Sequence, residues 1–393
     1  MSAIVKTGLD RVEALWPKHL LKADAGLVVH PASVNRHLVH ASDIMASSKK
    51  FRLKAFFGPQ HGIRGETQDN MVEWEGFRDK RTGLPVFSLY GETRKPGKEM
   101  LRDIDLMVVD LQDVGARYYT FIWTLGLIME ACLEAGKSVV ILDRPNPIGG
   151  DRIEGPVLKE GFSSFVGLRP FPVRHGMTIG EIGLYLRDHY YQRLDLHVIP
   201  MSGWRRSAWF EDTGLPWVFP SPNMPTVDTA AVYPGMCLLE GTNVSEGRGT
   251  TRPFEIFGAP WIDPDGLLKR LGDYRLPGVL FRPLYFLPTF QKHAGKLCGG
   301  AQIHVTDRAK FRPFLTGVGI VKAIYDLYPQ KFAWKQPPYE YEERLLPIDI
   351  LAGDDRLRKD IESGSDLHAM EVWWREELRA FDRKVRRNYL LYS

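Results

Sequence analysis

Two glutamates, Glu240 and Glu246, stand in a segment that also carries an arginine and three glycines, EGTNVSEGRGTT (240–251). The glycines allow the backbone to turn sharply. Two carboxyl groups beside Arg248 and several hydroxyl donors suit acid–base chemistry on a sugar. A phosphate-binding loop would need a lysine at the start of a helix, and two glutamates would repel a phosphate. The segment therefore favours a carbohydrate site over a nucleotide site, with a connection between domains as the structural alternative.

A second polar segment, HGIRGETQDN (61–70), comes soon after an apolar run that ends at Phe57. Dense polar side chains next to a buried strand are typical of a functional loop. We expect His61 and Glu66 to face a sugar and Arg64 to pair with a carboxylate. The alternative is an exposed loop whose charges are solvated.

A third segment, DLQDVGARYY (110–119), follows another apolar run. Asp113 is the better catalytic candidate here, because Asp110 can anchor the loop or cap the next helix. Arg117 is a candidate for binding the substrate, and Tyr118 can stack on a sugar face, although an aromatic side chain here can equally belong to the core.

Shorter motifs add further candidates for substrate binding. In DRPNP (143–147) two X-Pro bonds hold the chain in a rigid, extended path. A histidine such as His175 titrates near neutral pH. The candidates from these motifs are Asp143, Arg144, Asn146, His175, Asn223 and Asn243. For each of them, the alternative is a structural role.

Alternating strands and helices must position these side chains. Apolar runs end at residues 29, 57, 89, 109 and 142, and amphipathic segments over 124–135 and 178–188 predict helices. The pattern predicts a Rossmann-like, doubly wound, mostly parallel α/β sheet, whose site lies beyond the carboxyl ends of the strands. The length of 393 residues favours two domains. We place the catalytic domain at 1–230 and a smaller α+β domain, which completes the cleft, at 231–393.

The composition argues against several other classes. The net charge of +4 is small and spread out, so a nucleic-acid partner is not indicated. Three unpaired cysteines do not suggest a disulfide scaffold or a zinc site. The sequence has no secretory signal and no apolar span of membrane length, which predicts a cytoplasmic protein. The motifs of serine hydrolases, zinc proteases and dinucleotide enzymes do not occur. The oligomeric state cannot be read from the sequence.

The chain resembles the exo-β-N-acetylmuramidase family of peptidoglycan hexosaminidases. The likeness covers nearly the whole chain, in order, and EGTNVSEGRGTT and SPNMPT are long enough to be specific. The resemblance implies a Rossmann-like domain with an auxiliary domain, and release of terminal β-1,4-linked N-acetylmuramic acid from the non-reducing end of peptidoglycan fragments. It implies a role in cell wall recycling with a small glycan substrate and no cofactor. The matching stretches are 58–66, 88–91, 110–118, 142–147, 173–178, 214–225 and 240–251.

The resemblance suggests roles for the candidate residues. Glu240 or Glu246, in its protonated form, donates to the leaving oxygen. The second carboxylate is Asp113 or, as second choice, Glu66. It activates water, stabilises the oxocarbenium-like state or orients the 2-acetamido group of the substrate. Retaining, inverting and substrate-assisted mechanisms therefore all stay open. Binding the lactyl carboxylate of a muramic sugar needs a guanidinium, and the candidates are Arg64, Arg117 and Arg248.

One position departs from the family pattern. Relatives often carry a glutamate directly before the histidine that matches His61, in the motif P-E-H-G. This chain has Gln60 at that position. Glutamine cannot ionise, so it can serve neither as a general acid nor as a nucleophile. The alternatives are therefore a related hydrolase with an altered glycan or ester substrate, and a muramic-sugar-binding protein without catalytic activity.

Overall fold

The fold is known from a computed structural model that describes residues 4–65, 67–69 and 71–393. Its larger sheet has seven strands in the order β3-β4-β2-β1-β5-β6-β9, and only the β3–β4 pair is antiparallel. The mostly parallel sheet confirms the predicted fold class. The strands are β1 (Asp24–Val28), β2 (Arg52–Gly58), β3 (Phe77–Arg78), β4 (Pro85–Ser88), β5 (Leu106–Val109), β6 (Ser138–Leu142) and β9 (Leu196–Ile199).

Helices cover both faces of this sheet. On one face, α1 (Gly8–Leu15) and α2 (Ala41–Ser47) pack on one set of strand side chains. On the other, α3 (Lys98–Leu101), α4 (Phe121–Ala135) and α5 (Ile179–Tyr190) pack on the alternate set. Successive side chains of a strand point to opposite faces, so a strand that is apolar throughout needs cover on both. The arrangement is therefore doubly wound, as the apolar runs predicted.

The two predicted helices in this region are present. The helix predicted over 124–135 starts three residues earlier, at Phe121, and ends at Gly136, whose φ of 65° is left-handed. The helix predicted over 178–188 is α5, and Thr178 and Glu181 form the expected capping box.

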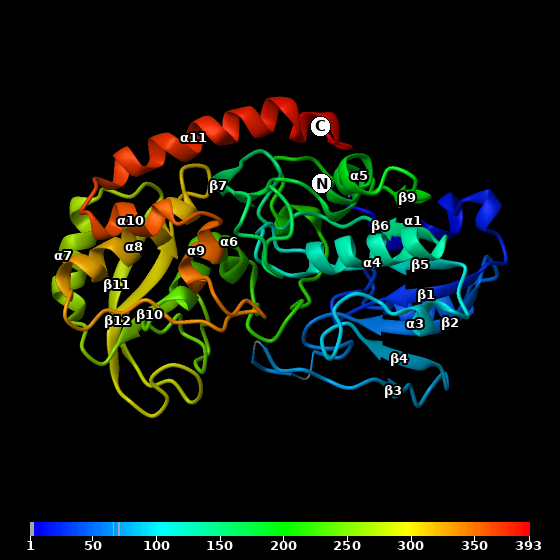
Figure 1. The fold of residues 1–393 in the computed structure, drawn as a ribbon, viewed down its shortest axis with the longest axis horizontal. Coiled ribbons are helices and arrows are strands. Elements are labelled where there is room, and N and C mark those ends of the chain that lie inside the picture. Colours follow the sequence, from blue (N-terminus) through cyan, green and yellow to red (C-terminus); the bar gives the residue numbers. More distant parts are fainter. Residues whose placement is uncertain (1–3, 66, 70) are drawn as a thin grey trace.

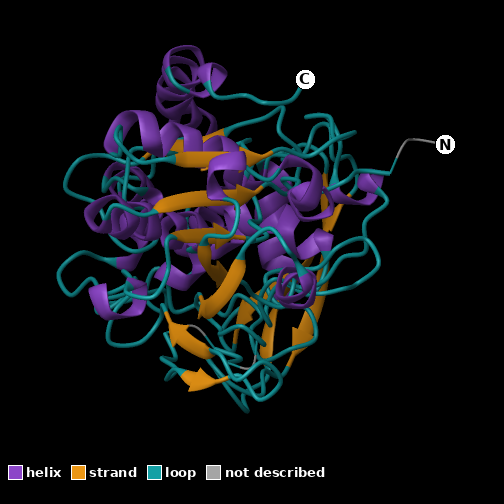
Figure 2. Ribbon diagram, turned by 90° about the vertical axis from the view of Figure 1, so that its right-hand side faces the viewer, coloured by secondary structure: helices purple, strands orange, loops and turns teal. Residues whose placement is uncertain are grey.

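A smaller antiparallel sheet, in the order β10-β12-β11, forms the centre of the second part of the chain. Figure 1 shows the two sheets side by side, and Figure 2 shows the molecule from the side on which the larger sheet lies. The predicted division at residue 230 lies within α6 and stays a prediction. The elements here are α6 (Val227–Met236), β10 (Ile256–Ala259), α7 (Pro264–Asp273), β11 (Val279–Phe286), β12 (Cys298–Val305), α8 (Pro313–Leu327), α9 (Pro347–Ala352), α10 (Arg356–Glu362) and α11 (Leu367–Lys384).

A two-stranded ribbon and four 3₁₀-helices complete the described structure: β7 (Glu154–Val157), β8 (Pro172–Arg174), η1 (Lys18–Leu20), η2 (Phe210–Thr213), η3 (Cys237–Gly241) and η4 (Arg386–Asn388). Within the described part of the chain, none of the helices combines the length and the apolar character that crossing a bilayer requires.

The helices α6 and α8 approach each other at two glycines. A Cβ atom on Gly235 would lie 1.9 Å from the carbonyl oxygen of Pro313, and one on Gly317 would lie 2.2 Å from that of Gly235. No side chain fits at either position, so glycine is required for this contact. The contact holds the start of η3, and hence Glu240, against the core.

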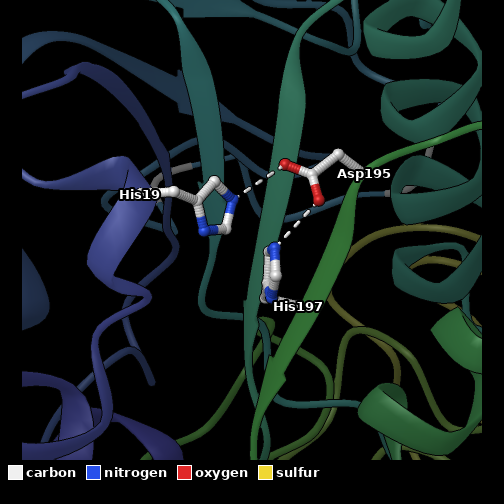
Figure 3. Close-up of side chains that lie close together, drawn as sticks. All are labelled: His19, Asp195 and His197. Atoms are coloured by element: carbon white, nitrogen blue, oxygen red, sulfur yellow. Dashed lines mark hydrogen bonds and ion pairs between the residues drawn. The ribbon is translucent and has the colours of Figure 1, made fainter.

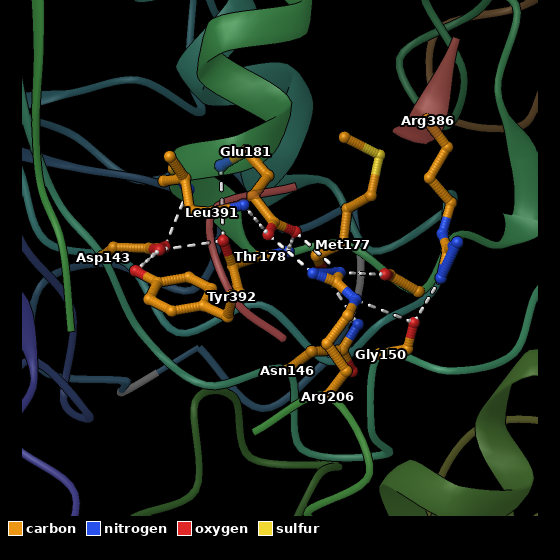
Figure 4. Close-up of polar contacts among 12 residues, drawn as sticks. Asp143, Asn146, Gly150, Met177, Thr178, Glu181, Arg206, Arg386, Leu391 and Tyr392 are labelled. Carbon is orange, nitrogen blue, oxygen red and sulfur yellow. Dashed lines mark hydrogen bonds and ion pairs between the residues drawn. The ribbon is translucent and has the colours of Figure 1, made fainter. Parts of the chain in front are cut away.

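The carboxyl end of the chain returns to the larger sheet. Helix α11 runs across the molecule from the second part to the first (Figure 1). The Tyr392 hydroxyl then donates to Asp143 at 2.5 Å, and the Leu391 amide donates to Glu181 at 2.7 Å. Arg206 donates to both oxygens of Glu181, at 2.7 and 2.9 Å (Figure 4). The last residues are thus a structural part of the first half.

Candidate active site

A narrow cavity lies between the carboxyl ends of the larger sheet and the second part of the chain. Loops after β2 and β5 form one side, and segments around residues 240 and 340 form the other. Its lining comprises Gln60, His61, Tyr118, Tyr119, Thr120, Phe121, Val166, Ser221, Asn223, Met224, Tyr233, Glu240, Arg248, Phe254, Tyr339 and Glu340. The cavity therefore brings together five sequence-predicted residues: His61, Tyr118, Asn223, Glu240 and Arg248.

Glu240 is buried at the wall of the cavity and is held by two donors. Arg248 donates to its Oε1 at 2.7 Å, and the Tyr339 hydroxyl donates to its Oε2 at 2.7 Å. Burial by itself would raise the pKa of Glu240, but the charge and hydrogen bond of Arg248, together with the Tyr339 hydroxyl, leave this pKa below its usual value. Glu240 is therefore a carboxylate at neutral pH, which differs from the protonated donor expected from the sequence.

Glu246 lies behind Arg248 and is not part of the cavity lining. Its Oε1 is 3.3 Å from Nε of Arg248, and its Oε2 accepts a hydrogen bond from Lys292 at 2.9 Å. Lys292 also donates to the carbonyl groups of Leu239 and Val244 at 2.8 and 3.1 Å. Two cations thus bind Glu246, and this arrangement positions Arg248 for its contact with Glu240.

Glu340 reaches the cavity from a tight turn. Tyr339 and Glu342 exchange backbone hydrogen bonds at 2.9 and 3.0 Å, and the two residues between them, Glu340 and Tyr341, have φ angles of 45° and 67°. Two-residue hairpin turns with positive φ at both central positions usually hold Asn-Gly. Side chains in this left-handed region store strain, which is typical of functional sites.

The environment of Glu340 favours its neutral form. Its Oε2 accepts a hydrogen bond from the Tyr90 hydroxyl at 2.8 Å, and Nε2 of Gln60 lies 3.4 Å from its Oε1. Burial raises the pKa of Glu340 to about 7, the neighbouring charge of Glu240 adds to this effect, and the hydrogen bonds from Tyr90 and Gln60 oppose it. The cavity thus holds one carboxyl group that ionises readily, Glu240, and one that is still about half protonated at pH 7, Glu340.

Gln60 is fixed between three partners. Thr120 donates to its Oε1 at 2.8 Å, while its Nε2 donates to Tyr90 at 3.0 Å and faces Glu340. A glutamine at this position supplies two N–H donors where a glutamate would supply only acceptors. Gln60 therefore orients Glu340 and Tyr90.

His61 turns into the cavity with a left-handed φ of 70°, and its Nδ1 lies 2.7 Å from the carbonyl oxygen of Thr67. Burial lowers the pKa of His61 to about 4, with a further contribution from Arg248. His61 is therefore neutral at pH 7. Its Nδ1 is protonated and donates to the carbonyl oxygen of Thr67, so Nε2 is unprotonated and can accept a hydrogen bond.

Asp113 and His175 form a buried pair outside the cavity lining. Nε2 of His175 is 3.1 Å from Oδ2 of Asp113, which also accepts a hydrogen bond from the Gly115 amide at 2.6 Å. Nδ1 of His175 accepts from the Met177 amide at 3.2 Å. The pair links the loop after β5 to the segment before α5, so the geometry favours a positioning role for both residues.

The other sequence candidates near the strand ends have structural partners. Asp110 and Arg144 form two hydrogen bonds with each other, at 2.5 and 2.8 Å. Asn146 binds the carbonyl group of Met177 at 3.0 Å, and Asp143 holds Tyr392 (Figure 4). Arg117 is fully buried and donates to three carbonyl groups, those of Pro156, Phe171 and Leu351. The structure does not bring these five side chains into the cavity lining.

Two further candidates, Arg64 and Asn243, also lie outside the cavity lining. The Arg64 side chain is 56% exposed and faces Asp79 at 3.6 Å. Asn243 pairs with the backbone of Lys331 and Ala333 at 2.8 and 3.0 Å. Glu66 lies outside the described residues.

Sequence reasoning missed the segment Tyr339–Glu340, as well as Tyr90 and Tyr233. The run PPYEYEER (337–344) does carry a signal, because acidic and aromatic residues alternate after two prolines. Without a preceding strand, however, nothing in the sequence indicates that this run faces the loops after β2 and β5.

Comparisons with known proteins agree along the whole chain. Residues 25–228 match the family described as exo-beta-N-acetylmuramidase NamZ, N-terminal, and residues 231–392 match its C-terminal counterpart. The peptidoglycan beta-N-acetylmuramidase NamZ of Bacillus subtilis (strain 168) is 45% identical over 388 residues, which cover 99% of this chain and 91% of that protein.

Two crystal structures of DUF1343 family proteins from Bacteroides fragilis NCTC 9343 share the fold. One has a TM-score of 0.88 with 35% identity and covers 99% of both chains. The other has a TM-score of 0.77 with 29% identity and covers 100% of this chain and 99% of its own. With both family regions matched in order, the chain belongs to the exo-β-N-acetylmuramidase NamZ family.

Proposed function

We propose that the chain is a glycosidase that releases terminal β-1,4-linked N-acetylmuramic acid from the non-reducing end of peptidoglycan fragments. The identity of 45% to a peptidoglycan beta-N-acetylmuramidase over nearly the full length supports this substrate class. The observation that carries the chemistry is the pair of buried carboxyl groups in one cavity, Glu340 and Glu240, whose surroundings drive their pKa values in opposite directions.

Such a pair divides the work of glycoside hydrolysis. Glu340, protonated near neutral pH, donates its proton to the glycosidic oxygen as the bond to the leaving sugar breaks. Glu240, ionised, stabilises the positive charge that develops at the anomeric carbon, or orients the water or acetamido group that attacks it. This assignment moves the acid from Glu240 or Glu246 to Glu340, because Arg248 favours the charged form of Glu240. Glu246 is paired with Arg248 and Lys292 and does not line the cavity.

Arg248 is our choice for the lactyl carboxylate of the muramic sugar. Its guanidinium lines the cavity and has five N–H donors, of which Glu240 and Glu246 engage only part. Tyr118 and Tyr119 offer aromatic surface next to it. A glucosaminide, which has no lactyl group, would leave the remaining N–H donors of Arg248 without a partner in the bound sugar.

The test compares a chromogenic β-N-acetylmuramide with the matching β-N-acetylglucosaminide, using wild-type protein and Arg248→Lys. Wild type is expected to release chromophore from the muramide with a kcat/KM at least about 100-fold above that for the glucosaminide, since a site built for a polar group discriminates strongly against its absence. Arg248→Lys keeps a positive charge but loses the bidentate geometry, and is expected to reduce this ratio.

Two results would change the proposal. Equal turnover of both glycosides would reject the muramic specificity. Tight binding of N-acetylmuramic acid by folded protein, without turnover of either glycoside, would favour the sugar-binding alternative that Gln60 raises. The division at residue 230, a small soluble fragment as substrate, and a cytoplasmic location stay predictions.

A further inference from the structure

A cluster of potential metal ligands lies at the edge of the larger sheet that is remote from the cavity. Its members are His19 on η1, Asp195 at the start of β9 and His197 on β9 (Figure 3). One nitrogen or oxygen atom from each lies within 4.8 Å of the other two. Since the cavity is at the carboxyl ends of the strands and this cluster is near their amino ends, the catalytic chemistry does not use it.

We propose that His19, Asp195 and His197 form a surface site for a divalent transition-metal ion, with zinc as the best match. Two imidazole nitrogens and one carboxylate oxygen are a ligand set typical of zinc, with a remaining position for water. Nε2 of His19 is 3.3 Å from Oδ2 of Asp195, and Nε2 of His197 is 2.9 Å from Oδ1. With bonds of about 2.0–2.2 Å, two ligands of a tetrahedral ion lie roughly 3.3 Å apart. The two imidazoles contact different oxygens of Asp195, and one ligand atom from each residue lies within 4.8 Å of the others, so the set must draw together by at most about 1.5 Å around an ion.

The scaffold behind the ligands is built into the fold. Ser138, the first residue of β6, donates to Oδ2 of Asp195 at 2.6 Å, and the Val139 amide donates to the carbonyl group of Asp195 at 2.9 Å. His197 lies within β9, in register with Val140. A hydrogen bond to a ligating carboxylate fixes its orientation and supports metal affinity.

The third ligand comes from a segment that is anchored close to the sheet. Leu20, next to His19, is buried, and its carbonyl group accepts a hydrogen bond from Nε1 of Trp16 at 3.1 Å. The His19 side chain itself is 56% exposed and its ring is 4.8 Å from that of His197. The backbone is thus held, and the exposed ring, which contacts Asp195 at 3.3 Å, is accessible to an ion. Bound metal would link η1 to β9, two segments 176 residues apart.

The experiment measures zinc binding by titration calorimetry on full-length protein that carries no polyhistidine tag and has been stripped with a chelator. Wild type is expected to bind one equivalent of Zn²⁺. His19→Ala and His197→Ala should each weaken binding by at least about tenfold, since loss of a supporting group alone costs that much. His304→Ala, which removes an exposed histidine from β12, is the matched control and should bind as wild type does.

Cobalt gives a second readout that does not depend on the variants. Co²⁺ should produce visible absorption bands of a four- or five-coordinate site in wild type and in His304→Ala, and Zn²⁺ should displace them. Absence of one-equivalent zinc binding by wild type would overturn the proposal. So would zinc binding that His19→Ala and His197→Ala weaken no more than His304→Ala does.

Discussion

Replacing Glu340 by glutamine tests the proposed acid directly. The substitution keeps the size of the side chain and an acceptor for Tyr90, but removes the proton that would reach the leaving oxygen. General acid catalysis contributes about 10²–10⁴-fold, so we expect kcat for a poor leaving group to fall by that factor, which corresponds to roughly 3–5 kcal/mol of transition-state stabilisation.

The pH dependence of kcat/KM provides a second test of Glu340 as the acid. With a pKa of about 7, Glu340 is half protonated at pH 7 and about one tenth protonated at pH 8. The kcat/KM of wild type should therefore fall about tenfold per pH unit above neutrality. Glu340→Gln should lose this alkaline limb, because its amide does not titrate.

The assay uses two β-N-acetylmuramides that differ in their leaving group. A dinitrophenolate leaves without protonation, whereas an alkyl alcohol or a sugar needs the proton. Glu340→Gln should be strongly impaired on the second type and nearly normal on the first. Glu343→Gln is the matched control, because Glu343 is exposed on the same segment.

The reasoning would be refuted by Glu340→Gln with near wild-type turnover of the poor leaving group. It would also be refuted by an equal loss on both leaving groups, since that pattern indicates a general structural defect. A persistent alkaline limb in the variant would show that another group titrates.

Three other predictions concern the stability of the fold. Glu340→Gln should stabilise the fold at pH 8 by roughly 3 kcal/mol relative to wild type. The pKa of Glu340 is about 7 in the folded protein and 4.5 in the unfolded chain, so wild type loses stability as the pH rises from 4.5 through 7. Urea unfolding at pH 4 and pH 8 should show the gain only at pH 8. Arg248→Ala leaves the buried Glu240 carboxylate without its cation and should cost about 3–5 kcal/mol in urea unfolding; a loss below 1 kcal/mol would contradict the assigned pairing. Tyr392→Phe removes a donor to the buried Asp143 and should cost about 1–3 kcal/mol, while Tyr285→Phe, at an exposed site, should unfold as wild type does.

The sequence predicted the fold of the first half because its signals are local. The strands β5 and β6 are nearly continuous apolar runs, and Thr178 with Glu181 marks the start of α5 by a capping box. Such patterns depend on residues a few positions apart, so they can be read without knowledge of the rest of the chain.

The site depends on contacts that the sequence does not encode locally. Tyr90 and Glu340, which share a hydrogen bond, are 250 positions apart. Arg117 has the chemistry of a carboxylate binder, yet its partners are three carbonyl groups supplied by segments up to 234 positions away. Residue type alone could not decide between these roles, because desolvation and pairing depend on the tertiary structure.

The protonation states of Glu240 and Glu340 could not be predicted from the sequence either. The sequence placed Glu240 beside Arg248, and the structure shows that this cation lowers the pKa of Glu240 rather than leaving it a proton donor. The carboxyl group with the raised pKa, Glu340, follows a segment without clear periodicity. Its role depends on burial against Tyr90 and Gln60.

The most direct test of the central claim uses two disaccharides of N-acetylmuramic acid and N-acetylglucosamine that differ only in their order. Mass spectrometry follows the free sugars released over time by wild type and by Glu340→Gln. We predict that wild type releases N-acetylmuramic acid when this sugar is at the non-reducing end and leaves the reversed disaccharide intact. The variant should be slower by about 100-fold or more. Cleavage of the reversed disaccharide at a similar rate, or release by the variant at the wild-type rate, would contradict this claim.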